Sequence, residues 1–165
     1  MVFNTKQLYI RKLSIKDQIA FFDLMRNPNV VIYTPSNPLN RNESDAKLDS
    51  LMNTHHHFWA VELKDTKEFI GIGGLKIVSD SEAEIAYSIR EAFWRKGYGT
   101  EIAQGLIKHA FQKTNFTLLT AFADPKNRTS LKILEKLMHP LGKVYSEEYQ
   151  CIDMKYELKK DNWVD

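Results

Sequence analysis

The sequence predicts a domain of the α/β (α+β) class, built on a mixed sheet with helices on its faces. Some segments alternate apolar and polar residues as half-buried strands do, and others repeat apolar residues at helical spacing. The two kinds of segment are interspersed along the chain, which favours a sheet covered by helices. A chain of 165 residues with 43% hydrophobic content buries one sizeable core. We therefore expect a single domain spanning residues 1–165.

The chain opens with a predicted strand followed by two predicted helices. The strand is expected at residues 8–13 and the first helix at residues 16–26, with Ile19, Phe22 and Met25 on its buried face. Proline between two asparagines at residues 27–29 ends that helix. A polar segment with two prolines then leads to the second helix at residues 43–53. We interpret this irregular segment as a candidate lining of a substrate entrance.

The rest of the chain predicts five more strands and two more helices. Three strands form an antiparallel meander at residues 58–63, 69–78 and 84–89. A glycine turn then opens a helix with apolar residues at helical spacing from Ile102 to Phe111. A strand at 116–123, a helix at 127–138 and a strand at 151–158 complete the pattern.

Composition excludes several classes of protein. With 23 basic and 21 acidic residues, the net charge of +2 gives no general reason to expect nucleic acid or an anionic membrane as a partner. The single cysteine, Cys151, excludes an internal disulfide and is consistent with a reducing compartment. The first residues lack the apolar core of a signal peptide, and the longest apolar run is too short for a membrane span. We therefore expect a cytoplasmic protein.

The most informative segment is Trp94–Glu101, which contains two glycines and two cations between an expected strand and an expected helix. Glycines let the main chain turn tightly and approach a ligand closely, so the free N–H groups at a helix start can bind phosphate oxygens. The same glycines also suit a turn that only packs a helix on a strand. An anion cradle and a plain turn are therefore both open on this segment alone.

Residues along most of the chain resemble the GCN5-related N-acetyltransferases (GNAT), and within them the N-terminal acetyltransferases of ribosomal proteins. The strongest part of the resemblance is the glycine segment followed, at the expected separation, by a helix that begins with Asn-Arg-Thr-Ser. The segments that carry it are Leu8–Leu13, Phe58–Asp65, Ile70–Leu75, Glu84–Tyr87, Trp94–Glu101, Asn127–Ser130 and Leu134–Leu137.

The resemblance implies a GNAT-like, mostly antiparallel central sheet of about six or seven strands flanked by about four helices. It also implies acetyl-CoA as the cosubstrate, with its pantetheine arm lying like an extra strand along the edge around Ser88 and Ile89. The residues expected to bind acetyl-CoA are Ser88, Ile89, Arg95, Lys96, Gly97, Tyr98, Gly99, Thr100, Asn127 and Ser130.

Acyl transfer to an amine requires a proton acceptor for the amine and a donor for the departing sulfur. Glu84 is the favoured base, because it shares a strand face with Ala86 and Ser88; it would otherwise be a solvated carboxylate. By resemblance, Ser130 is the candidate acid and Asn127 a pantetheine contact, although Asn127 also suits a helix cap and Ser130 a first helical turn. Alternatives are Glu147 and Glu148 as bases, and Tyr145 and Tyr149 as donors.

No metal site is expected. The run of histidines at residues 55–57 has no Asp, Glu or Cys at ligand spacing beside it, and adjacent strand residues face opposite ways. We interpret this run as a loop or as a lining of the acceptor site. Cys151 is expected to be a buried small apolar residue rather than a nucleophile, because direct transfer needs no acyl-enzyme.

The expected function is direct transfer of an acetyl group from acetyl-CoA to a primary amine, either a protein N-terminus or a small-molecule amine such as a polyamine. Residues 138–142 depart from the family pattern and the final hairpin looks short, which motivates an alternative: a catalytically weak acyl-CoA sensor or interaction module. Nucleotide binding unrelated to CoA fits the glycines but lacks the usual phosphate-loop ending. The expected quaternary state is a monomer or a homodimer.

Overall fold

The computed structural model describes all residues 1–165 and contains one sheet of eight strands in the order β1-β2-β3-β4-β5-β6-β8-β7. Every neighbouring pair is antiparallel except β5 and β6, which are parallel. The strands are β1 (Phe3–Asn4), β2 (Leu8–Lys12), β3 (His57–Leu63), β4 (Phe69–Ile77), β5 (Glu82–Ile89), β6 (Leu118–Ala123), β7 (His139–Ser146) and β8 (Cys151–Lys159).

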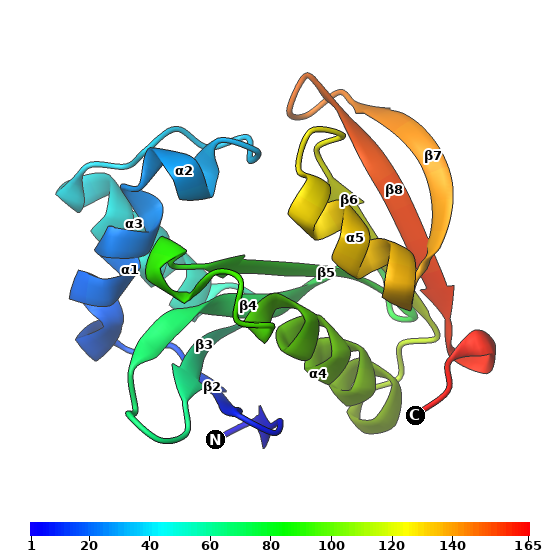
Figure 1. Ribbon diagram of the computed structural model, residues 1–165, viewed down its shortest axis with the longest axis horizontal. Coiled ribbons are helices and arrows are strands. Elements are labelled where there is room, and N and C mark those ends of the chain that lie inside the picture. The colour runs from blue at the N-terminus through cyan, green and yellow to red at the C-terminus, as the bar shows by residue number, and fades with distance from the viewer.

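The sheet parts between β5 and β6. Their pairing covers only Glu82–Glu84 against Leu118–Thr120, at the beginning of both strands. Beyond Glu84, β5 continues to Ile89 beside β4 alone, while β6 continues with β8 and β7. Figure 1 shows the consequence: β7 and β8 run steeply away from the direction of β5. The carboxyl-terminal half of β5 therefore has a free edge in the middle of the sheet.

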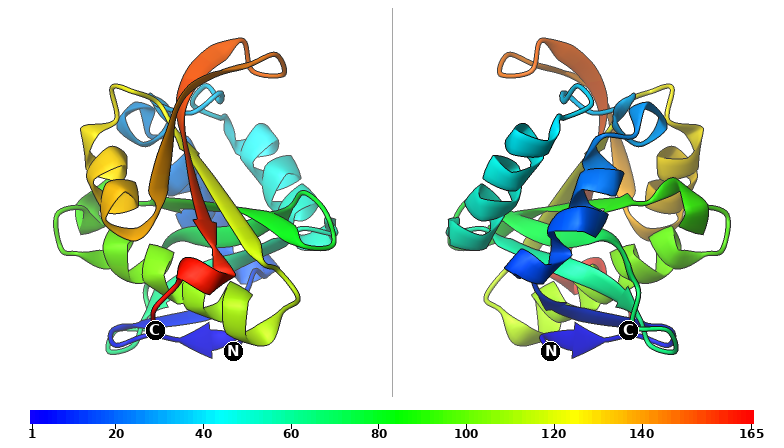
Figure 2. Two further views of the ribbon diagram at one scale, coloured as in Figure 1. Left: turned by 90° about the vertical axis from the view of Figure 1, so that its right-hand side faces the viewer. Right: turned by 90° about the vertical axis from the view of Figure 1, so that its left-hand side faces the viewer.

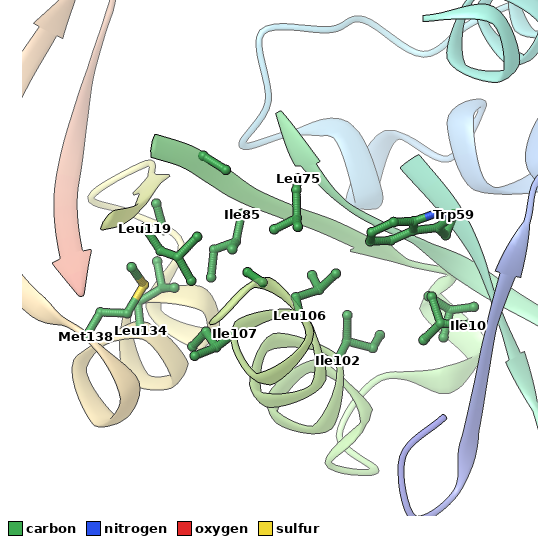
Figure 3. Packing of buried hydrophobic residues seen from close by; sticks show 14 of the residues in the cluster. Ile10, Trp59, Leu75, Ile85, Ile102, Leu106, Ile107, Leu119, Leu134 and Met138 are labelled. Atoms are coloured by element: carbon green, nitrogen blue, oxygen red, sulfur yellow. The ribbon is translucent and has the colours of Figure 1, made fainter. Parts of the chain in front are cut away.

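One face of the sheet packs against α4 (Tyr98–Lys113) and α5 (Arg128–Leu137). Apolar residues of α4 recur at intervals of three and four, so one side of the helix enters the core. Figure 3 shows Leu106 of α4 below Leu75 and Ile85 of the sheet, and Ile107 of α4 on the side of Leu134 and Met138. These residues belong to a cluster of 22 buried side chains that holds α4 under the free edge of β5.

The opposite face carries α1 (Gln18–Met25), α2 (Pro28–Val31) and α3 (Arg41–Asn53). Figure 2 shows α1 and α3 together on this side of the sheet, away from α4. A separate cluster of six buried residues, including Phe21, Leu24 and Leu48, packs these helices on β3 and β4. Three short 3-10 helices lie at Ile15–Asp17, Glu91–Phe93 and Lys160–Asn162. None of the helices combines the length and apolar character that a membrane span requires.

The mixed α/β sheet and its main elements confirm the predicted fold class. The sequence patterns did not predict β1, β7 or the four-residue α2, so the sheet has eight strands rather than six or seven. The final hairpin is also longer than expected, with strands of eight and nine residues. A bulge between Pro140 and Gly142 interrupts the alternation of β7, whose residues are exposed or half-buried, and this hides the strand from a pattern search.

The predicted buried face of the first helix is wrong. Ile19 is 69% exposed, whereas Phe21 and Leu24 are fully buried. The helix is shorter than expected, because Ile15–Asp17 form a separate 3-10 turn that rotates the apolar positions relative to a single continuous helix. The buried Asp17 fixes this turn, since its carboxylate accepts hydrogen bonds from Arg11 Nη2 at 2.7 Å and from the Ser14 main chain at 2.9 Å.

Leu106→Ala is expected to destabilise the protein by about 3 kcal/mol, because it leaves a cavity between α4 and the sheet. Ile19→Ala is the control and is expected to change the free energy of unfolding by less than about 0.5 kcal/mol, as exposed positions do. Urea unfolding of both variants measures these values. A larger loss for Ile19→Ala than for Leu106→Ala would contradict the described core.

Candidate functional site

Helix α4 begins without a side-chain cap. Gly97 is the N-cap residue and has a φ of +83°, in the left-handed region that glycine alone adopts readily. The first intrahelical bond runs from the Glu101 N–H to the Gly97 oxygen at 3.1 Å, so the N–H groups of Tyr98, Gly99 and Thr100 have no acceptor in the helix. Together with the positive end of the helix dipole, they form an anion cradle, here the segment Arg95–Thr100.

The second glycine of the cradle has a different role. A Cβ at Gly99 would lie 3.0 Å from Ile133 Cδ1 of α5 and 3.6 Å from Ile89 Cδ1 of β5. Gly99 therefore permits the close approach of α4 to α5 and to the end of β5. Arg95 and Lys96 are exposed beside the free N–H groups and form no ion pair, so their charges are available to an anion.

The free edge of β5 presents unpaired main-chain groups to the opening between β5 and β6. The Arg90 N–H donates to the Ile70 oxygen at 2.8 Å, which fixes the alternation along the antiparallel β4–β5 pair. It follows that the main chain of Ser88 faces β4, whereas the main chains of Tyr87 and Ile89 face the opening. The Ile89 oxygen accepts a hydrogen bond from the Trp94 indole at 2.8 Å. The Ile89 N–H and both main-chain groups of Tyr87 remain for a ligand.

Glu84 lies where the opening begins, on the sheet face opposite α4. It pairs across the strands with Lys76 of β4. Burial raises the pKa of Glu84; the Lys76 ammonium lowers it, and the Asp153 and Glu148 carboxylates raise it further. A half-buried carboxylate with a raised pKa, at the end of the parallel pairing, is a stronger proton acceptor than an exposed glutamate.

Ser130 lies on the other side of the opening, in the first turn of α5. Asn127 is the N-cap residue of that helix, and its side-chain oxygen accepts the Ser130 N–H at 3.2 Å. The amide nitrogen of Asn127 makes no hydrogen bond within the protein and can donate to a ligand. The Ser130 hydroxyl also makes no hydrogen bond, and it lies beside the hydroxyl of Tyr87. Burial raises the pKa of Tyr87, and the neighbouring Ser130 lowers it.

The hairpin of β7 and β8 brings the alternative candidates to different places. The Tyr149 ring lies near Lys76, whose Nζ is 5.8 Å from the ring centre. The Glu148 carboxylate raises the pKa of both Glu84 and Lys76. Tyr149 is thus on the Glu84 side of the sheet and not beside Ser130. Tyr145 is 59% exposed and Glu147 is exposed, and no contact joins either to the site.

The histidines at residues 55–57 and Cys151 have structural surroundings. The Ile77 N–H donates to His56 Nδ1 at 3.0 Å, and His57 stacks on Trp59. No group of three or more His, Cys, Asp or Glu side chains is arranged to hold a metal ion. Cys151 is half-buried, and burial and nearby Asp153 raise its pKa, which disfavours the thiolate.

The site also contains two residues that sequence reasoning did not single out, Tyr87 and Lys76. Both belong to strands in which they look like ordinary members of an alternating pattern. Tyr87 follows Glu84 by three residues, so its side chain points to the opposite face of β5, toward α4 and α5. Only the register of Lys76 against Glu84 shows that the two are partners. A cavity of about 810 Å³ lies elsewhere, between the outer side of α4 and both chain ends.

The parted sheet and the uncapped N-terminus of α4 together form a site suited to an extended, anionic ligand. Residues 7–137 match the family model described as an acetyltransferase (GNAT) domain. The chain belongs to the GNAT acetyltransferase family and is an N-acetyltransferase.

Known proteins agree with this assignment. Over 99% of both chains, the protein is 26% identical to the uncharacterized N-acetyltransferase YnaD of Bacillus subtilis (strain 168). It superimposes on a GNAT-family acetyltransferase from Bacillus anthracis with a TM-score of 0.87 and 21% identity, covering 96% of this chain and 98% of that chain.

Two other solved structures of similar fold contain ligands. RimL, a ribosomal L7/L12 α-N-protein acetyltransferase in complex with coenzyme A, has a TM-score of 0.83 and 14% identity, covering 98% and 99% of the two chains. A spermidine N-acetyltransferase from Vibrio cholerae, in complex with CoA and spermine, has a TM-score of 0.82 and 17% identity, covering 96% and 99%. At these identities the likeness is one of fold.

Gly97→Val is expected to weaken acetyl-CoA binding about tenfold or more, because a β-branched residue strongly disfavours the positive φ on which the cradle depends. Gly142→Val is the matched control: Gly142 also has a positive φ, of +98°, and no atom lies within 4 Å of its Cβ position, but it belongs to β7. Calorimetric titration with acetyl-CoA measures both affinities. Equal affinities for Gly97→Val and the wild type would contradict the cradle.

Proposed function

We propose that residues 1–165 act as one domain that transfers an acetyl group directly from acetyl-CoA to a primary amine, without an acyl-enzyme. The observation that carries this proposal is the position of Glu84 at the apex of the opening between β5 and β6, beside the unpaired main-chain groups of β5. The single cysteine agrees with a reducing compartment, and we propose that the enzyme is cytoplasmic.

The residues of the site fit acetyl-CoA. The free N–H groups of Tyr98, Gly99 and Thr100, together with Arg95 and Lys96, would hold its pyrophosphate. The main chain of Ile89 would pair with the pantetheine amides, and the Asn127 amide would donate to the same arm. When bound, acetyl-CoA supplies a thioester that reacts with an amine nitrogen. The Tyr87 N–H, which also faces the opening and lies nearer to Glu84 along β5, is suited to donate to the thioester oxygen as negative charge develops there.

Glu84 would act as the base. Amines are protonated at neutral pH, so one proton must leave the nitrogen before it can attack the carbonyl carbon. The carboxylate of Glu84 takes that proton directly or through a water molecule and releases it to solvent. As the C–N bond forms and the C–S bond breaks, the nitrogen loses a second proton, which ends on the sulfur of coenzyme A. Ser130 lies on the other side of the opening, where its hydroxyl would donate a hydrogen bond to the departing sulfur.

The surroundings of Glu84 favour a cationic amine as the acceptor. The carboxylates of Glu148 and Asp153 act on Glu84 together with the single ammonium of Lys76, so this side of the opening carries more negative than positive charge. Both a protein N-terminus and a small-molecule amine present such an ammonium. The RimL and spermidine acetyltransferase structures are examples of the two acceptor classes on this fold. We propose no metal in the reaction, because deprotonation and charge stabilisation are assigned to residues of the chain.

The test is acetyl transfer itself. Wild-type protein is incubated with acetyl-CoA and a panel of spermidine, simple diamines and peptides with free N-termini, and released coenzyme A is measured. We expect saturable acetyl-CoA binding and turnover with at least one acceptor. Glu84→Gln is expected to lower kcat about 100-fold or more, as loss of a general base does, with acetyl-CoA affinity unchanged. Tight binding without transfer to any amine would support the sensor alternative, and full activity of Glu84→Gln would place the base elsewhere.

The pH dependence of kcat/KM provides an independent prediction about Glu84. A base must be ionised, so activity rises with pH through the raised pKa of Glu84, above the ordinary glutamate value. Lys76→Met removes the cation that lowers this pKa, so the acidic limb should move to higher pH. Glu148→Gln removes an anion that raises the pKa, so the limb should move to lower pH. Shifts in the same direction for both variants would contradict the assignment of Glu84 as the base.

A further inference from the structure

The hydroxyl of Tyr87 is buried and makes no hydrogen bond. A buried, unpaired hydroxyl has lost its hydrogen bonds to water without replacement, a free-energy cost that a phenylalanine at the same position would avoid. The ring is packed against the first turn of α4, since a Cβ at Gly99 would lie 3.8 Å from Tyr87 Cε2. The ring therefore has little freedom to carry its hydroxyl to water, and a polar partner must come to it.

Only three buried side-chain oxygens of the chain lack a partner: those of Ser44, Tyr87 and Tyr156. Ser44 lies in α3, and Tyr156 lies in β8 behind α5, both away from the opening. Of the three, only Tyr87 lies in the half of β5 that pairs with β4 but has no strand on its other edge. The unpaired hydroxyl thus coincides with the candidate site, which points to a role there.

Ser130 is the partner within reach. Its hydroxyl also makes no hydrogen bond, while its N–H is held by the cap residue Asn127 at 3.2 Å. Ser130 lies one turn before Ile133 on α5, and Ile133 and the Tyr87 ring both approach Gly99, at 3.0 and 3.8 Å from its Cβ position. The Ser130 side chain therefore lies beside the Tyr87 ring, although the two oxygens do not meet hydrogen-bond geometry in this structure. Burial raises the pKa of Tyr87, so its hydroxyl keeps its proton and remains a donor.

We propose that Tyr87 is a positioning residue for Ser130: its hydroxyl donates a hydrogen bond to Ser130 Oγ and so turns the Ser130 O–H toward the departing sulfur. This inference rests on the proposed acetyl transfer and deepens it. A serine hydroxyl carries one proton and two lone pairs, so a donor fixed on one lone pair restricts the directions left to its own proton. Both protons stay on their oxygens, and the amine nitrogen supplies the proton that the sulfur finally carries.

The position of Tyr87 on β5 gives this arrangement a geometric basis. Side chains alternate along the strand, so Glu84 and Tyr87 face opposite sides of the sheet from positions three residues apart. The base therefore acts on the acceptor side and the pair of hydroxyls acts on the side of α4 and α5. The main-chain groups of Tyr87 itself face the opening between them. The single strand β5 would then position the base Glu84, the main-chain donors and the Tyr87 hydroxyl that orients Ser130.

The test compares Tyr87→Phe with Tyr156→Phe, since each removes one buried, unpaired hydroxyl and nothing else. Acetyl-CoA turnover is measured with the acceptor that the wild-type protein uses best, and stability is measured by urea unfolding. We expect Tyr87→Phe to lower kcat about tenfold, the effect of one lost orienting hydrogen bond, with the KM for acetyl-CoA little changed. Its stability should equal or exceed that of the wild type. Tyr156→Phe should match the wild type in kcat.

The combination with Ser130→Ala decides whether Tyr87 acts through Ser130. If it does, Tyr87→Phe has no further effect on kcat in the Ser130→Ala protein. An equal loss with and without Ser130 would overturn the proposal, as would wild-type kcat in Tyr87→Phe. Absence of transfer by the wild-type protein is a separate result, which would count against the proposed function itself.

Discussion

The parting of β5 from β6 after three paired residues is the constraint on which the rest of the site depends. A sheet normally satisfies the main-chain groups of an interior strand on both edges, and unpaired groups cost free energy unless water or a ligand replaces the missing strand. Here the Trp94 indole satisfies the oxygen of Ile89 and leaves its N–H free. The remaining groups of β5 are therefore available, in extended geometry, to an arm that itself carries amides.

The helices on the two faces of the sheet give the opening two chemically different sides. On one face, the apolar side of α4 enters the main core, which sets its uncapped N-terminus beside the end of β5. The other face carries α1, α2 and α3. On that face, Glu84 lies near the carboxylates of Asp153 and Glu148 and the ammonium of Lys76. The segment that joins β5 to α4 is connected to α2 by hydrogen bonds. Its Glu91 carboxylate accepts them from the Asn27 side chain at 2.7 Å and from the Asn29 side chain at 2.9 Å. The two sides are thus held in a fixed relation.

The sequence was sufficient for those parts of the structure that depend on local patterns. Alternation predicted β5, the spacing of apolar residues predicted α4, and the glycines of residues 97–99 predicted a tight turn at its start. Parts that depend on pairing were not predictable in the same way. The Lys76–Glu84 partnership follows from strand register, and the burial of the Tyr87 hydroxyl follows from how α4 and α5 close over β5. The error at Ile19 has the same origin, since a short 3-10 turn changed which side of α1 meets the sheet.

The most direct test of the account is amide hydrogen exchange along β5, measured by NMR with and without saturating acetyl-CoA. The Ser88 N–H faces β4 and should exchange slowly in both states. The Tyr87 and Ile89 N–H groups face the opening and should exchange faster in the free protein and slowly in the complex, because the pantetheine arm takes the place of the missing strand. Slowed exchange at Tyr87 and Ile89 would support the central claim. Unchanged exchange at both residues, in protein shown to bind acetyl-CoA, would contradict it.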